Sequence, residues 1–203
     1  MKPGSRSLRL GLVTLALIWS GSSLSFAQMP TEQVKETVGR VVMILRDPTF
    51  TTENKRAQRR EMLRQAILPR FDFSDMAKRS LGNHWKNQQE RQGEFVAAFT
   101  DFVENTYVGK VESFKDEKVV FVRERVDQDL AEVDTKIIPG KGEPFSINYM
   151  LHLVGSEWKV YDVVIENISL VNNYRSQFNR ILTTASFDEL LRKLREKGSR
   201  VGS

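Results

Sequence analysis

The strongest constraint on the fold of this 203-residue chain is a change in the spacing of its apolar residues near residue 118. Before that point apolar side chains recur every three or four residues, whereas residues 118–166 have patterns typical of strands. Runs 131–137 and 145–153 alternate apolar and polar residues, 118–126 is rich in Val and Phe, and 158–166 is apolar on both faces. The segments between them are short and built of turn residues, and connections of that length join only antiparallel neighbours. The sequence therefore predicts a four-stranded antiparallel meander.

Helical spacing predicts six helices around this sheet. Their expected ranges are 30–46, 52–68, 73–81, 88–111, 171–182 and 187–197. Gly82 follows the third helix at the position where a C-terminal cap is expected. Because helices precede and follow the strands instead of alternating with them, the predicted class is α+β. No linker, repeat or low-complexity stretch interrupts residues 30–197, so we expect a single domain over 28–203.

Residues 1–27 have the pattern of an export signal. Lys2, Arg6 and Arg9 precede an apolar run from Leu10 to Trp19, and small residues lead to a cleavage site near Ala27. The run is shorter than the roughly 20 residues that span a bilayer. We therefore expect cleavage and export, most simply to a bacterial periplasm. Removing these three positive charges lowers the formal net charge from +5 to +2, so nucleic acid is not an expected partner.

The residues that could carry chemistry are few. The chain has no cysteine and only two histidines, His84 and His152, which excludes thiolate centres, disulfides and three-histidine metal sites. The common hydrolase, zincin and nucleotide-binding motifs are absent. We expect His84 to cap or pack between helices and His152 to be solvated. The sequence thus predicts no catalytic residue, no metal and no cofactor.

The last strand, 158–166, has large apolar residues on both faces. Simple alternation places Trp158, Val160 and Val164 on one face and Tyr161, Val163 and Ile165 on the other. A strand of this kind is covered on both sides, either by helices or by a helix layer and an apolar cavity. Both readings remain open. Asp162 and Glu166 fall on the face of Trp158, about 13 Å apart along the strand, which is too far for a glycosidase pair. We expect them to make structural hydrogen bonds.

The second predicted helix carries a basic face. Its members are Lys55, Arg56, Arg59, Arg60 and Arg64. Such a face is usually a solvated surface, but it also suits docking onto an acidic partner or an anionic membrane, where each basic residue adds about 1 kcal/mol.

The segment 158–178, WKVYDVVIENISLVNNYRSQF, resembles the signature of the MlaC family. Further matches are Phe71-Asp72-Phe73 with Met76-Ala77, Leu81-Gly82 with His84-Trp85, and Phe95, Phe99 and Tyr107 in the long helix. The resemblance covers about residues 30–197. One departure is Asn167, where the family usually has glycine; asparagine also tolerates a left-handed backbone.

The resemblance implies a periplasmic phospholipid carrier of NTF2-like architecture that is not an enzyme. Its implied ligand is a glycerophospholipid, with the acyl tails in a deep apolar pocket and the headgroup near solvent. The implied partners are an inner-membrane ABC transporter with an MCE ring and an outer-membrane lipoprotein–porin complex. Two other classes stay open: an NTF2-like enzyme with Asp162 at the pocket base, and a periplasmic adaptor with a filled core.

Matching the family's aromatic and aliphatic positions gives ten expected pocket residues. They are Tyr107, Val111, Phe121, Val133, Tyr149, Leu151, Val160, Val164, Tyr174 and Phe178. Four arginines are the expected contacts to the headgroup or to a partner protein. They are Arg175, Arg56, Arg59 and Arg60.

Overall fold

The computed structural model describes residues 29–50, 52–114 and 117–200. The signal peptide expected over residues 1–27 lies outside the described residues. The helices are α1 (Pro30–Arg46), α2 (Arg56–Ile67), α3 (Phe73–Leu81), α4 (Gln92–Glu112), α5 (Leu170–Thr184) and α6 (Phe187–Arg200). Short 3-10 segments span Pro48–Phe50 (η1), Glu53–Lys55 (η2), Leu68–Arg70 (η3) and Gly82–Arg91 (η4). None of the described helices is long and apolar enough to cross a membrane.

The strands form one antiparallel sheet in the order β1-β2-β3-β4-β5. They are β1 (Lys118–Asp127), β2 (Leu130–Ile138), β3 (Phe145–Val154), β4 (Glu157–Ile165) and β5 (Ile168–Ser169). The α+β class and the meander are confirmed, but the expected count of four strands is wrong because β5 was missed. A tight turn at Glu166 and Asn167, with φ of 47° and 67°, folds this two-residue strand back onto β4. Asn167 thus adopts the left-handed backbone that asparagine tolerates.

A β-bulge in β4 changes which side chains share a face. Leu151 pairs with Val160 and Met150 pairs with Asp162, so Tyr161 is the extra residue. Beyond a bulge the alternation of faces is reversed relative to a simple period of two. Val163 therefore lies on the same face as Val160, whereas Asp162 lies on the opposite face. This corrects the expected placement of Asp162 beside Trp158 and of Val164 beside Val160.

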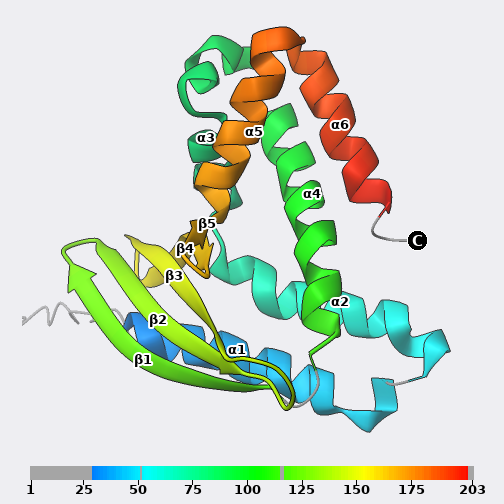
Figure 1. The fold of residues 1–203 in the computed structure, drawn as a ribbon, viewed down its shortest axis with the longest axis vertical. Coiled ribbons are helices and arrows are strands. Elements are labelled where there is room, and N and C mark those ends of the chain that lie inside the picture. Colours follow the sequence, from blue (N-terminus) through cyan, green and yellow to red (C-terminus); the bar gives the residue numbers. More distant parts are fainter. Residues whose placement is uncertain (1–28, 51, 115–116, 201–203) are drawn as a thin grey trace, which may run out of the picture.

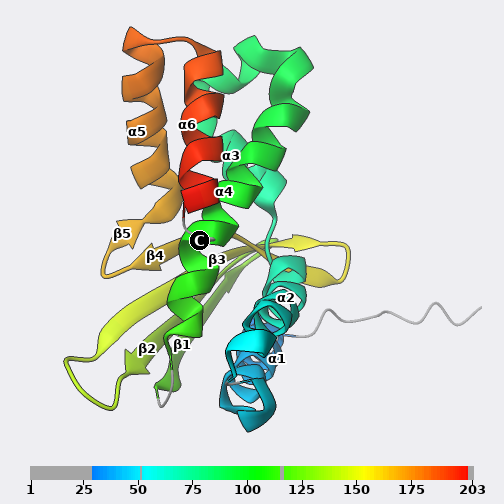
Figure 2. The same ribbon diagram turned by 90° about the vertical axis from the view of Figure 1, so that its right-hand side faces the viewer.

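The sheet is curved, and α1 and the C-terminal end of α4 lie over its inner face, while α2 packs beside α1 (Figures 1 and 2). At the start of α1, the backbone N–H of Thr31 donates to Glu124 on the inner face of β1, at 2.7 Å. The outer face of β1 and β2 carries ion pairs instead, such as Arg123–Asp134 at 2.9 Å. Helices therefore cover the sheet on its inner face, and α3 and α5 also contact β4.

The remaining helices stand above the sheet, where α3, α5 and α6 surround the first part of α4 (Figure 1). Their core is aromatic: Phe95 and Phe99 of α4 meet the edge of Phe178 of α5 at centroid distances of 5.8 and 6.2 Å. The expected start of the long helix at residue 88 is wrong. A 3-10 segment occupies Gly82–Arg91, with a non-helical backbone at Gln88, and α4 begins only at Gln92.

Candidate functional site

The described structure contains an apolar cavity of about 240 Å³ between the sheet, α1 and α4. An engineered cavity of about 150 Å³ with aliphatic and aromatic walls stays dry and binds benzene. The present cavity is larger and is lined by the same kinds of side chain. It therefore suits a hydrocarbon ligand. Its apolar wall residues are Val34, Val38, Val41, Val42, Leu45, Ile67, Leu68, Phe71, Phe73, Met76, Val103, Val108, Val111, Phe114, Val119, Ile137, Ile147, Val160, Val163, Ile165 and Leu170.

One wall of the cavity is the apolar stripe of α1. Val34, Val38, Val41, Val42 and Leu45 recur at helical spacing and all line the cavity. Only Val34 among them is fully buried. An apolar stripe that continues along a helix without becoming buried is what a helix facing a hollow shows. The sequence revealed the stripe but not the hollow, because packed cores and cavity walls use the same side chains.

Two tyrosines, Tyr107 and Tyr149, line the cavity. Burial raises the pKa of Tyr149 to about 12, although a hydrogen bond with Thr135 opposes the shift. Tyr107 lines the cavity and its hydroxyl lies 3.0 Å from that of Tyr174, whose pKa is raised chiefly by burial. The wall thus carries phenol groups beside its aliphatic side chains.

The carboxylate of Glu104 is the most deeply buried charged group at the wall. Its side chain is 4% exposed and pairs with Arg64 of α2 at 2.6 Å. Burial raises the pKa of Glu104, and the positive charge of Arg64 opposes that rise. A second ion pair, Arg60–Glu112 at 3.2 Å, joins the same two helices. These two ion pairs connect α2 to α4, and only Leu63 and Ala66 of α2 are buried.

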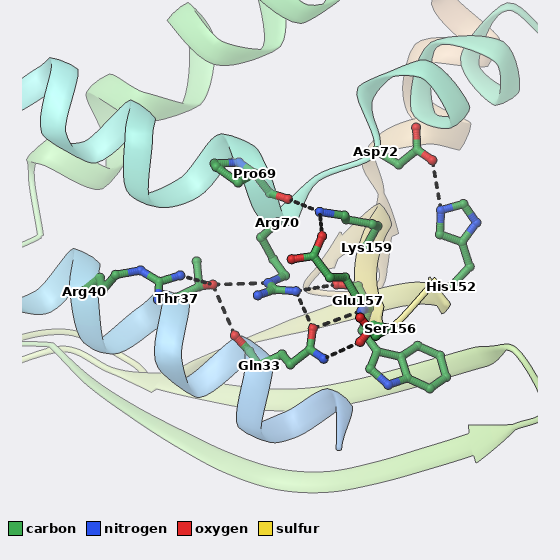
Figure 3. A network of polar contacts seen from close by, with 11 residues as sticks. Gln33, Thr37, Arg40, Pro69, Arg70, Asp72, His152, Ser156, Glu157 and Lys159 are labelled. Atoms are coloured by element: carbon green, nitrogen blue, oxygen red, sulfur yellow. Dashed lines mark hydrogen bonds and ion pairs between the residues drawn. The ribbon is translucent and has the colours of Figure 1, made fainter. Parts of the chain in front are cut away.

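A polar network joins α1 to β4 (Figure 3), and its members Thr37 and Arg70 also line the cavity. Arg70 donates to the side-chain oxygen of Gln33 at 2.5 Å and to the carbonyl of Trp158 at 2.8 Å. Gln33 also accepts from the backbone N–H of Trp158 at 3.0 Å. Arg70 donates further to Thr37 at 3.3 Å, and burial lowers its pKa. The network fixes the N-terminal half of α1 to the sheet and satisfies the guanidinium of Arg70 within the protein.

Four of the ten residues expected at the pocket lie on the cavity wall. They are Tyr107, Val111, Tyr149 and Val160. Their contact with a lipid stays a prediction.

The other six expected residues do not line the cavity. Val133, Leu151, Tyr174 and Phe178 are buried in the packed core, where neighbouring side chains fill the space around them. Val164 is turned to the outer face by the bulge in β4. Phe121 lies on the inner face, but the ammonium of Lys35 sits over its ring at 5.5 Å.

The four arginines expected to contact a headgroup lie away from the cavity wall. Arg60 is paired with Glu112, and Arg175 donates to the carbonyl of Arg79 at 2.9 Å. Arg59 buries its Nε without a hydrogen-bond partner among the described residues, and Arg56 is exposed but has contacts within the chain. Their role toward a headgroup or partner stays a prediction.

A different arginine, Arg46, lies on the cavity wall. Its sequence context does not single it out, because a basic residue in the last turn of a helix is common.

The polar candidates on β3 and β4 make structural contacts. Asp162 is buried and accepts from the backbone N–H of Val163 at 2.8 Å and of Val171 at 3.0 Å, and from the hydroxyl of Ser169 at 2.5 Å. It thus holds the start of α5 and does not line the cavity. The expectation that His152 is solvated is wrong, because its Nε2 lies 3.0 Å from the carboxylate of Asp72 at the start of α3.

The other two candidates also make contacts within the chain. The Nε2 of His84 lies 3.0 Å from the Oδ1 of Asn179, a residue of α5. Glu166 accepts from the backbone N–H and the hydroxyl of Ser146, and these bonds lower its pKa. No group of three or more histidines, aspartates and glutamates among the described residues is placed to hold a metal ion.

Comparison with known proteins gives three consistent findings. The family profile described as MlaC protein matches residues 35–196. The "Intermembrane phospholipid transport system binding protein MlaC" of Haemophilus influenzae is 24% identical over 146 residues, which cover 69% of this chain and 68% of that protein. A phospholipid-binding protein from Ralstonia solanacearum, solved in complex with a phospholipid, superposes with a TM-score of 0.74 at 24% identity. That match covers 87% of this chain and 100% of the other, so the fold is shared.

Proposed function

The chain belongs to the MlaC family, and we propose that it is a phospholipid carrier whose cavity holds the acyl tails. The observation that carries this proposal is the cavity itself, which is apolar, large and built by three separate parts of the chain. The named relative belongs to a phospholipid transport system, and the similar structure contains a phospholipid. Both support the same ligand for this chain.

The energetics of lipid transfer explain why such a carrier is needed. Two tails of about 14 methylenes each, at about 0.8 kcal/mol per buried CH₂, cost roughly 22 kcal/mol to expose to water. A cavity wall without a dedicated polar cluster can hold these tails, because phospholipids with different headgroups carry the same kind of hydrocarbon tail. No covalent step and no cofactor is required, and Asp162, the only residue suggested for an enzyme, lies off the wall.

We place the carrier between two membranes. The predicted signal peptide directs the chain to the periplasm, where it would receive and deliver glycerophospholipids. The proposed partners are an inner-membrane ABC transporter with an MCE ring and an outer-membrane lipoprotein–porin complex. These parts of the proposal rest on the family and on the sequence of residues 1–27.

We propose that lipid enters where α2 meets α4. The contact between these helices depends on the ion pairs Arg60–Glu112 and Arg64–Glu104, which water can replace when the helices separate. The N-terminal half of α1, by contrast, is fixed to β4 by the Arg70 network. The α1–α2 pair can therefore move away from α4 about that fixed end and admit the tails.

Two adjacent valines of β4 test whether the cavity is the binding site. Val163 lines the cavity, whereas Val164 lies on the outer face. Val163→Phe fills space that tails would occupy, so we expect lipid transfer between vesicles to fall strongly while Val164→Phe transfers like the wild type. Thermal unfolding confirms that both variants are folded. Equal transfer by folded Val163→Phe and wild-type protein would contradict a tail site in this cavity.

A further inference from the structure

Four charged side chains reach the cavity wall, and three of them are engaged within the chain. They are Arg46, Arg70, Glu104 and Glu117. Arg70 donates to Gln33 and to the carbonyl of Trp158, and Glu104 pairs with Arg64. Glu117 has an interaction of its own within the chain. Arg46 is the remaining charge.

Arg46 lies where the cavity wall reaches solvent. It belongs to the last turn of α1, directly after the lining residue Leu45, and its side chain is exposed. Among the residues that the structure describes, it makes no ion pair or hydrogen bond through its guanidinium. An arginine that borders an apolar cavity and keeps its donors free is available to an anion held at the cavity edge.

We propose that Arg46 binds the phosphate of the carried lipid and so gives the site its preference for phospholipids over neutral lipids. This inference rests on the proposed function, because a tail in the cavity is what brings a headgroup to the edge. A phosphodiester offers two oxygens that the planar guanidinium binds as a fork. The phosphate stays hydrated there, so the contact selects for the anion without the desolvation that a buried site requires.

The test compares two ligands that have the same tails. Binding of phosphatidylglycerol and of diacylglycerol is measured for wild type, Arg46→Gln, Arg46→Lys and Arg180→Gln. Arg180 is exposed on α5 and is not part of the wall, so its variant controls for net charge. We expect Arg46→Gln to weaken phosphatidylglycerol binding about five- to tenfold and to leave diacylglycerol binding unchanged. Arg46→Lys should be intermediate, and Arg180→Gln should resemble wild type.

If Arg46→Gln weakens both ligands equally, or neither, Arg46 does not read the phosphate. A free phosphate ion is checked with inorganic phosphate alone: binding of this ion that is lost in Arg46→Gln, with lipid binding unchanged, would also overturn the proposal. If wild type binds neither lipid, it is the carrier function that fails, and the two failures are thereby distinguished.

Discussion

Asp162 shows how one buried carboxylate organises the junction between the sheet and α5. Its two oxygens accept from two backbone N–H groups and from the hydroxyl of Ser169. One of those N–H groups, that of Val171, belongs to the first turn of α5, where helix donors lack partners of their own. The carboxylate therefore acts as a cap supplied from β4.

This role predicts a loss of stability without a loss of lipid transfer. Asp162→Ala leaves the N–H of Val171 unpaired, so we expect the free energy of unfolding to fall by about 2 kcal/mol. Asp162→Asn keeps one acceptor and should lose less. Urea unfolding measures both variants, and vesicle transfer per folded molecule should match wild type. Normal stability combined with abolished transfer would instead place Asp162 in the functional machinery.

The bulge in β4 explains why the faces occupied by some of its residues could not be predicted from the sequence. The alternation of β3 is regular, and Tyr149 lies on the face that this alternation predicts, where it lines the cavity. In β4 one extra residue, Tyr161, reverses the faces beyond it, which moved Val164 out and brought Val163 and Ile165 in. No local residue pattern marks a bulge of this kind. Val133 and Leu151 were expected at the pocket but are buried in the packed core. Their hydrophobicity does not distinguish the two places, because packed cores and cavity walls use the same side chains.

Among the elements, α2 and α4 are joined by an unusual contact. The partners of the Arg64–Glu104 ion pair differ in exposure: the side chain of Arg64 is 39% exposed, whereas that of Glu104 is 4% exposed. Removing the partner of a buried charge costs more than removing the buried charge itself. The two halves of this pair should therefore respond differently to substitution.

We expect Arg64→Gln to destabilise the protein by about 2 kcal/mol at neutral pH, and Glu104→Gln to have little effect. Burial already raises the pKa of Glu104, so the folded state favours its protonated form. The penalty in Arg64→Gln is thus present above the pKa of Glu104 in the folded protein and disappears as acid protonates the carboxyl. Urea unfolding at neutral and acidic pH measures this. A pH-independent penalty in Arg64→Gln would contradict the account.

The boundaries of most elements could be predicted because their end signals are local. Pro30 begins α1 and Asp47-Pro48 follow its end, whereas Gly82 follows α3, and both helices have the expected ranges. The α4 boundary failed because residues 82–91 adopt a 3-10 conformation that the apolar stripe of the long helix does not reveal. β5 was not predicted because a strand of two residues is too short to show any alternation.

For the whole molecule, the proposed entry route predicts that joining α2 to α4 blocks lipid exchange. The chain has no cysteine, so Arg60→Cys with Glu112→Cys introduces the only thiols. A short cleavable cross-linker between them should stop vesicle transfer, because the helices can no longer separate, and reduction should restore it.

A matched cross-link provides the control. Glu94 of α4 and Arg195 of α6 form an ion pair of 2.6 Å in the helical part, away from the cavity wall. Cysteines at these two positions, joined by the same reagent, should leave transfer unchanged. If the 60–112 cross-link permits full transfer, lipid enters by another boundary.

The most direct test of the carrier function is the mass of the protein purified from cells together with whatever it binds there. We would purify the mature chain from the periplasm without detergent and record native and then denaturing mass spectra. The account predicts an added mass in the native spectrum that is released on denaturation and identified as phospholipid. A native spectrum at the bare mass of the chain, with no uptake from added phospholipid vesicles, would contradict it.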